Sequence, residues 1–249
     1  MDPHATAAEG RLRPPVTLIA GKFRSRHFGT APFLAEAFAA TGKDQPLALY
    51  IGAANGDNRA FGSGLSVLLK SAGARSVLWP KLGRGKQEHG AAHAALAEAD
   101  LVFVGGGDVE AGIQALGDAG LIDAVHAAAE RGAVFVGMSA GAIMLGARWI
   151  RWAHEGAGDD EAETYACLGL VQCSFDTHGE DDDWSETRSF ASVRARETGK
   201  RAHAYGIPSG GALVVAGDGT MRALGEPVVV FAASPNKEVE MEGVLEAAE

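Results

Sequence analysis

Short apolar runs alternate with alanine-rich segments along much of the chain. Four of these runs contain almost no polar residue: Val16–Ala20, Leu47–Ile51, Leu101–Val104 and Ala133–Val136. A strand covered on both faces gives such a run, whereas a half-exposed strand alternates apolar and polar positions. Between the runs, residues 31–40 are rich in alanine and residues 61–73 carry leucines at helical spacing. The pattern predicts an α/β fold, with a mostly parallel sheet flanked by helices on both faces.

The pattern changes beyond these runs. Residues 148–164 are polar, and we expect them to form an exposed excursion over the site or a mobile loop. Residues 212–216 and 221–224 flank Gly217–Thr220, a turn segment that contains an Asp-Gly pair. Because Asp-Gly favours the tight turn of a two-stranded hairpin, we predict a C-terminal β-hairpin.

The length and composition favour one globular domain. The chain has 249 residues, of which 47% are hydrophobic and 22% charged, so it can bury a sizeable core. We expect a flexible leader at residues 1–15 and a single α/β domain at residues 16–235. Residues 236–249 form an acidic C-terminal tail low in bulky apolar residues, and we expect its end to fray.

Charge and cysteine content narrow the expected partners and location. The net charge is −10 and no cluster of lysine and arginine forms a stripe, which argues against nucleic acid and anionic membranes as partners. Two cysteines make no disulfide scaffold, and no apolar segment resembles a secretion signal or a membrane span. We therefore expect a cytoplasmic protein. His89 and His93 share a helix face but lack a third ligand nearby, so we expect no metal and no cofactor.

A GxSxG motif stands at the end of one apolar run. Gly137, Ser139 and Gly141 are followed by a small-residue helical stretch, which is typical of a sharp strand-to-helix turn with an exposed serine hydroxyl. Backbone segments approach so closely there that a Cβ at either glycine would collide. Free N–H groups at the helix start would surround a developing oxyanion. The motif alone leaves an ordinary helix cap open as the alternative.

A serine needs a base to become nucleophilic at neutral pH, and imidazole has a suitable pKa. His178 is the candidate because it follows an apolar segment downstream of Ser139, and His154 is a weaker one. Gly105–Asp108 also follows a predicted strand. Because the carboxyl ends of parallel strands share one edge, this glycine turn should lie beside the turn at Ser139.

Five sequence blocks resemble the S51 serine peptidases, the group that contains aspartyl dipeptidase (peptidase E) and cyanophycinase. They are GGGD at 105–108, GMSAGA at 137–142, FDTHGE at 175–180, SETR at 185–188 and GIPSGGALVV at 206–215. The resemblance covers nearly all of the chain after residue 16. It implies a fold similar to class I glutamine amidotransferases, with serine where those enzymes carry cysteine.

The resemblance also implies roles for individual residues. Ser139 would be the nucleophile, His178 the base, and the amides of Gly107 and Ala140 the oxyanion hole. Arg188 matches an arginine that reads an acidic substrate side chain in the dipeptidases, and a guanidinium suits a carboxylate because it donates two parallel hydrogen bonds. The interval from His178 to Arg188 is shorter than in that family, and a surface arginine in an ion pair is the alternative.

Two positions depart from the family pattern. Ser209 stands in Pro-Ser-Gly where the family has the acid of its catalytic triad, and a hydroxyl cannot stabilise an imidazolium as a carboxylate does. Three outcomes stay open: Ser209 orients His178, Asp176 or Glu155 substitutes for the acid, or catalysis is lost. Asp108 replaces an asparagine of the dipeptidases and adds negative charge near the site.

These observations favour a serine peptidase that hydrolyses short peptides through an acyl-enzyme, with a preference for acidic residues as a narrower expectation. An ester or a cyanophycin-like β-aspartyl bond is an open alternative linkage. The alternative from another class is an S51-like protein that binds a small peptide or amino acid without turnover. A phosphate-binding loop at residues 105–107 is a third reading, although the GxGxxG spacing is absent. The sequence leaves the assembly open, a homodimer included.

Overall fold

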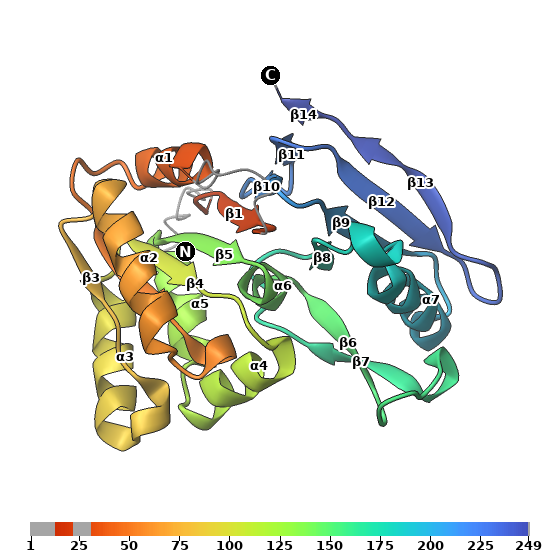
Figure 1. Ribbon diagram of the computed structural model, residues 1–249, viewed down its shortest axis with the longest axis horizontal. Helices are drawn as coiled ribbons and strands as arrows, with labels where there is room; N and C mark the ends of the chain where they lie inside the picture. Colours follow the sequence, from red (N-terminus) through yellow and green to blue (C-terminus); the bar gives the residue numbers. More distant parts are fainter. Residues whose placement is uncertain (1–12, 22–30, 249) are drawn as a thin grey trace, which may run out of the picture.

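The computed structural model describes residues 13–21 and 31–248, and it confirms the predicted α/β class. An eight-stranded sheet has the order β14-β11-β10-β1-β5-β4-β2-β3 (Figure 1). Its strands are β1 (Val16–Ile19), β2 (Leu47–Ile51), β3 (Ser76–Leu78), β4 (Leu101–Val104), β5 (Val134–Met138), β10 (Ala212–Val215), β11 (Met221–Leu224) and β14 (Ala247–Ala248). Strands β1, β5, β4, β2 and β3 pair in parallel. Their carboxyl ends therefore share one edge, where a binding site is expected.

The predicted C-terminal hairpin is present. Strand β10 pairs antiparallel with both β1 and β11, and β11 follows it directly. In the turn, the Gly219 N–H donates to the Ala216 carbonyl at 2.9 Å, and the Thr220 N–H donates to Oδ1 of Asp218 at 2.9 Å. The Asp-Gly pair thus closes the turn as the sequence indicates.

Helices cover both faces of this sheet. They are α1 (Ala31–Ala40), α2 (Arg59–Ser71), α3 (Lys86–Glu98), α4 (Val109–Asp118), α5 (Ile122–Arg131) and α6 (Ala140–Leu145). Alternate residues of β2 belong to different buried clusters, Tyr50 with Leu65 of α2 and Leu49 with Leu96 of α3. Since successive side chains of a strand point to opposite faces, the continuous apolar run reflects burial on both faces.

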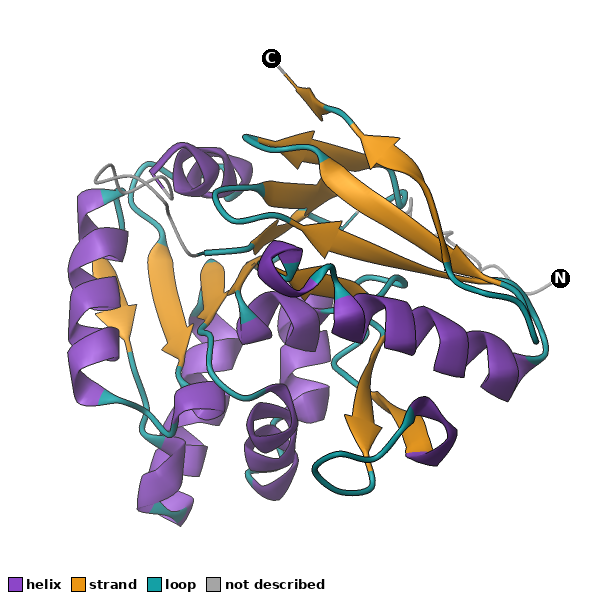
Figure 2. Ribbon diagram, turned by 45° about the vertical axis from the view of Figure 1, so that its right-hand side comes forward, coloured by secondary structure: helices purple, strands orange, loops and turns teal. Residues whose placement is uncertain are grey.

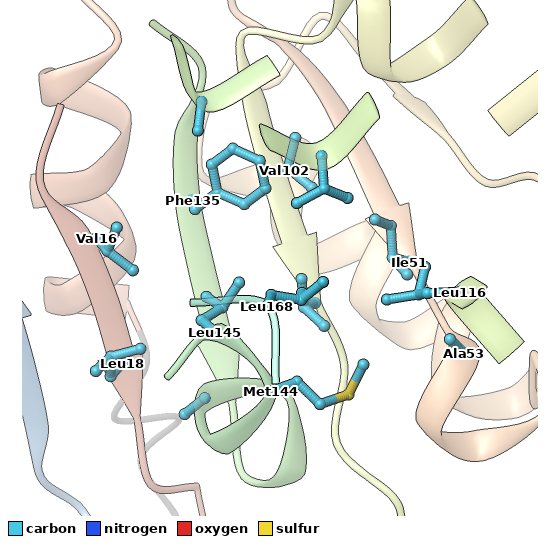
Figure 3. Close-up of a cluster of buried hydrophobic side chains, with 14 of the residues drawn as sticks. Val16, Leu18, Ile51, Ala53, Val102, Leu116, Phe135, Met144, Leu145 and Leu168 are labelled. Atoms are coloured by element: carbon cyan, nitrogen blue, oxygen red, sulfur yellow. The ribbon is translucent and has the colours of Figure 1, made fainter. Parts of the chain in front are cut away.

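The larger cluster fills the face covered by α3, α4, α5 and α6. Figure 3 shows Phe135 of β5 and Val102 of β4 on adjacent strands, with Leu145 of α6 nearby. All three are at most 1% exposed. Full burial of a side chain of this size stabilises the fold by about 1.5–3 kcal/mol, so this cluster anchors α6, whose first residue follows Ser139.

Strands that follow α6 in the sequence form a second sheet (Figures 1 and 2). It has the order β13-β12-β9-β8, with β8 (Phe175–Thr177), β9 (Ala202–Ile207), β12 (Val228–Ala233) and β13 (Glu240–Leu245). Helix α7 (Ser185–Thr198) packs against β9 and β12. Strands β8 and β9 are parallel, so Thr177 and Ile207 lie beside each other at their carboxyl ends. Short 3-10 turns lie at η1 (Ala53–Asn55), η2 (Leu82–Arg84), η3 (Asp159–Glu161) and η4 (Glu180–Asp182).

The expectation of a loop over residues 148–164 is wrong. The segment contains β6 (Arg148–Trp152) and most of β7 (Ala162–Ala166), which pair antiparallel. Trp149 is 4% exposed and stacks on Phe190 of α7, with ring centroids 5.5 Å apart. The hairpin has no clear strand pattern in the sequence because buried Trp149 and half-buried Trp152 and Tyr165 are spaced irregularly among charged residues. The connection at residues 153–161 is mainly exposed.

The expectation of a frayed end is also wrong for residues 240–248. Strand β13 pairs with β12 and β14 pairs with β11. Arg201, which immediately precedes β9, makes exposed ion pairs with Glu240 and Glu242, both at 3.0 Å. The acidic residues are therefore strand residues facing a basic partner. Of the predicted leader, residues 1–12 lie outside the described residues.

No helix in the described part of the chain is long and apolar enough to cross a lipid bilayer.

The two glycines of the GxSxG motif sit where backbone segments meet. A Cβ at Gly137 would lie 2.6 Å from Cα of Ala142, and one at Gly141 would lie 2.1 Å from the Val104 carbonyl oxygen. Contacts this short with backbone atoms cannot be relieved by rotating a side chain. The predicted collision is confirmed, and the turn at Ser139 depends on both glycines.

We predict that Gly141→Ala lowers the free energy of unfolding by about 2–4 kcal/mol, because the added methyl group must push β4 and α6 apart. Gly117→Ala in α4 is the matched control, since its Cβ would have no atom within 4 Å. That variant should gain about 0.5–1 kcal/mol from helix propensity. Urea unfolding measures both, and equal stabilities of the two variants would contradict the packing argument.

Candidate active site

Ser139 occupies a strained turn between β5 and α6. Its φ of +54° and ψ of −127° lie in a region that non-glycine residues rarely adopt, at a cost of about 1–3 kcal/mol. The Ser139 N–H donates to the Ile19 carbonyl of β1 at 2.9 Å, and its own carbonyl accepts from the Ala142 N–H at 2.8 Å. These bonds hold the turn, so the side chain projects from the carboxyl edge of the sheet.

His178 reaches Ser139 from the second sheet. It directly follows β8, has a φ of +51°, and donates its N–H to the Ile207 carbonyl at 2.9 Å. Its Nε2 lies 2.8 Å from Oγ of Ser139. When Nε2 accepts the hydroxyl proton, Nδ1 carries the ring's own proton. The structure therefore brings together the two residues that the sequence analysis paired.

The glycine turn after β4 lies against Ser139. A Cβ at Gly106 would be 3.0 Å from Cβ of Ser139, and one at Gly107 would be 2.0 Å from the Ala54 carbonyl oxygen. Gly107 also has a φ of +146°, which disfavours any side chain. The turn can approach the hydroxyl only because these residues are glycines.

Two N–H groups are available beside the serine. Ala140 is the first residue of α6, so its N–H has no acceptor within the helix. Among the described residues, neither Ala140 nor Gly107 donates its N–H in a hydrogen bond. Such groups, together with the positive end of the helix, suit a developing negative charge.

Asn55 was not identified from the sequence and holds the glycine turn. Its Nδ2 donates to the Gly106 carbonyl at 2.8 Å and to the Tyr50 hydroxyl at 3.0 Å, while its Oδ1 accepts from the Asn58 N–H at 3.1 Å. In a trans peptide the C=O and N–H point in opposite directions, so this bond turns the Gly107 N–H away from Asn55. Its position just after strand β2, at the edge where the carboxyl ends of the parallel strands meet, could have indicated a role in the site.

Asp176 is a buried carboxylate near the histidine. Its Oδ1 accepts from the Thr177 N–H at 2.7 Å, and its Oδ2 accepts from the Thr187 hydroxyl at 2.6 Å. Burial raises the pKa of Asp176, whereas these hydrogen bonds and the nearby His178 act to lower it. The carboxylate therefore interacts with His178 through charge, and no described hydrogen bond joins the two side chains.

The other two candidates for orienting His178 differ in position. Ser209 follows β9, beside the strand that carries His178, and its N–H donates to Oε1 of Glu180 at 3.1 Å. No hydrogen bond between Ser209 and His178 occurs among the described residues. Glu155 lies in the exposed β6–β7 connection. His154 lies there too, 3.6 Å from Glu161, and makes no contact with Ser139.

Arg188 is engaged away from Ser139. Its Nε donates to the Asp183 carbonyl at 2.9 Å, a terminal nitrogen lies 3.4 Å from Oδ2 of Asp183, and the guanidinium lies 4.7 Å from the Phe231 ring centre. Asp108 uses its Oδ1 to cap α4, accepting from the Ala111 N–H at 2.8 Å. Neither side chain lines the hollow beside Ser139.

That hollow is a cavity of about 860 Å³ that opens on Ser139 and His178. Its other described lining residues are Ala20, Gly21, Asn55, Asn58, Ala60, Phe61, Gly64, Leu65, Leu68, Gly106, Gly107 and Met138. The cavity is thus mainly apolar and adjoins the reactive pair, as expected of a small-molecule site.

No cluster of three or more metal-binding side chains occurs within residues 13–21 and 31–248. His89 lies with its Nε2 3.0 Å from the Leu82 carbonyl oxygen.

Comparisons with known proteins agree with this geometry. The sequence profile of Peptidase family S51 matches residues 25–222, and no curated protein matches the chain significantly. Among solved structures, a peptidase from an acI-B1 Actinobacterium superposes with a TM-score of 0.69 at 17% identity, covering 95% of this chain and 96% of that one. A putative peptidase E protein from Listeria monocytogenes EGD-e gives 0.62 at 16% identity, covering 85% and 98%.

At these identities the structural matches establish the fold alone. The profile match extends over most of the chain and includes the blocks at residues 105–108, 137–142, 175–180 and 185–188. It confirms the resemblance noted in the sequence. The chain belongs to Peptidase family S51.

Proposed function

We propose that the protein is a serine peptidase that cleaves short peptides through an acyl-enzyme on Ser139. The contact of 2.8 Å between Oγ of Ser139 and Nε2 of His178 carries this proposal, because it provides a hydroxyl with a base in hydrogen-bond reach. The strained turn and the adjoining cavity support it, since they expose the hydroxyl to a bound molecule.

The chemistry follows from the positions of these groups. Nε2 of His178 removes the hydroxyl proton as Oγ attacks the peptide carbonyl carbon, and the carbonyl oxygen becomes an oxyanion. The N–H groups of Gly107 and Ala140 stabilise that oxyanion. His178 then gives its proton to the departing amine as the carbon–nitrogen bond breaks. A water molecule, deprotonated by the same ring, hydrolyses the ester and regenerates Ser139.

We assign the support of His178 to two residues. The buried charge of Asp176 stabilises the imidazolium at longer range. Ser209 lies just beyond the end of the neighbouring strand without a hydrogen bond to His178, and its hydroxyl would have to turn toward Nδ1 in the substrate complex to accept from it. The Asp176 assignment is supported by the position of this buried carboxylate in β8, two residues before His178. The Ser209 assignment is supported by the pairing of β8 with β9.

Binding without turnover is the second candidate. It is favoured by one observation, that Asp176 directs both carboxylate oxygens to Thr177 and Thr187 and makes no hydrogen bond to His178. The first experiment below separates binding from catalysis.

We expect Ser139→Ala to lower kcat on any hydrolysed short peptide by at least about a thousandfold, since the nucleophile is lost. A fluorophosphonate should add its mass to the peptide containing Ser139 in the unaltered protein and to no peptide of the variant. Ser71→Ala, at an exposed serine ending α2, is the control and should keep both activity and labelling. Peptide binding with neither labelling nor product would instead support the binding protein.

Asn55→Asp should lower kcat by about 10–100-fold with little change in KM, because the glycine turn loses its anchor and one oxyanion donor is misplaced. The substitution keeps the acceptor for the Asn58 N–H but removes the donor to the Gly106 carbonyl. Asn58→Asp is a matched control, because it adds the same charge to the same cavity and keeps the cap of α2. Equal losses in the two variants would assign the effect to charge instead.

Asp176→Asn should lower kcat by about tenfold, because the imidazolium formed in the transition state loses an attractive charge. For the same reason, the acid limb of the pH profile of kcat/KM should move to lower pH. Ser209→Ala should lower kcat without moving that limb, since it removes a neutral group. Identical pH profiles for Asp176→Asn and the unaltered protein would rule out the charge interaction.

A further inference from the structure

One helix supplies many of the described residues that line the cavity beside Ser139. Five lining residues come from α2: Ala60, Phe61, Gly64, Leu65 and Leu68. Their spacing places them on one face of the helix, so α2 presents an apolar stripe to the cavity. Leu65 is 5% exposed and Phe61 is 37% exposed. The stripe therefore runs from the core to an open rim.

The other described lining residues include the reactive groups. Met138 ends β5 beside Ser139, and Gly106 and Gly107 form the glycine turn. Among the described lining residues, the polar side chains are Asn55, Asn58, Ser139 and His178. Among the described lining residues there is no lysine, arginine, aspartate or glutamate. The described part of the lining therefore offers no fixed cation to an incoming carboxylate.

Comparing the free energies of placing a carboxylate and an apolar side chain in the cavity favours the apolar side chain. A carboxylate that gives up hydration against the described lining residues gains no ion pair with them in return. Removing apolar surface from water gains about 25 cal/mol per Å². Arg188, the residue expected to read an acidic side chain, already contacts Asp183 and lies over Phe231. It does not line the cavity.

We propose that the α2 stripe makes this protein selective for peptides with a large apolar side chain, such as leucine or phenylalanine, on a residue adjoining the scissile bond. This proposal rests on the serine peptidase function argued above. It replaces the acidic preference that the family resemblance implies with a preference set by α2. The apolar side chain packs on Leu65 and Leu68 while its peptide carbonyl lies against Ser139.

Gly64 offers a direct way to change this wall. It lies within α2 and lines the cavity, and a Cβ there would have no atom within 4 Å. A long side chain can therefore be introduced without a backbone clash, and replacing glycine in a helix favours folding by up to about 1 kcal/mol. Gly64→Arg adds a cation to the cavity, and Gly64→Gln adds a neutral side chain of similar reach.

The first experiment measures kcat/KM on two series of dipeptides, X-Ala and Ala-X, where X is Leu, Phe, Asp or Glu. In one series the apolar members should exceed the acidic members by at least about tenfold, equivalent to 1.4 kcal/mol. Acidic members that match or exceed the apolar ones in both series would overturn the proposal. Fluorophosphonate labelling of Ser139 in the same preparation shows that the peptidase function stands in that case. No labelling and no turnover would overturn the function and the preference together.

The second experiment repeats the favoured series with the Gly64 variants. Gly64→Arg should raise the ratio of Asp to Leu turnover by at least about tenfold, because a cation now meets the carboxylate. Gly64→Gln should leave that ratio within about threefold of the unaltered protein. Thermal unfolding verifies that both variants fold. Equal ratios in the two folded variants would overturn the assignment of this wall to substrate recognition.

Discussion

The hydrogen bond between Ser139 and His178 joins two sheets, and the candidate site depends on how those sheets are held. Ser139 directly follows β5 of the eight-stranded sheet, and His178 directly follows β8 of the four-stranded sheet. Each residue has a positive φ and is fixed by a backbone hydrogen bond to a neighbouring strand, at Ile19 and Ile207. Strain of about 1–3 kcal/mol at each position is sustained by the surrounding sheet, so the side chains meet without a loop having to close.

The candidate site also requires backbone segments to approach one another closely. Gly141 packs against the Val104 carbonyl, and Gly107 packs against the Ala54 carbonyl. These contacts bring the start of α6 and the turn after β4 to the same hydroxyl. Asn55 adds a side-chain anchor to that turn. The reactive serine, its N–H donors and the apolar wall of α2 are thus attached to rigid elements of one sheet edge, which is an arrangement suited to preorganised catalysis.

Sequence patterns predicted the elements whose burial is uniform. Strands β2 and β4 and helix α1 have the predicted bounds, because runs covered on both faces leave a clear apolar signal. The β6–β7 hairpin was missed because Trp149 is buried among charged neighbours. Ser139 and His178 were found through a motif and a strand end. Asn55 was not, because its role comes from three-dimensional contacts with a distant turn, and the group that orients His178 depends on side-chain geometry that spacing does not encode.

The C-terminal strands link the two sheets and so help to align them. Strand β13 belongs to the sheet that carries His178, while β14, two residues further on, belongs to the sheet that carries Ser139. The last described residues therefore connect the two sheets across the same boundary that the Ser139–His178 hydrogen bond crosses. Proteolytic trimming or a bulky fusion at this end would loosen the boundary itself, so the chemistry would be sensitive to the state of a segment that contributes no residue to the cavity.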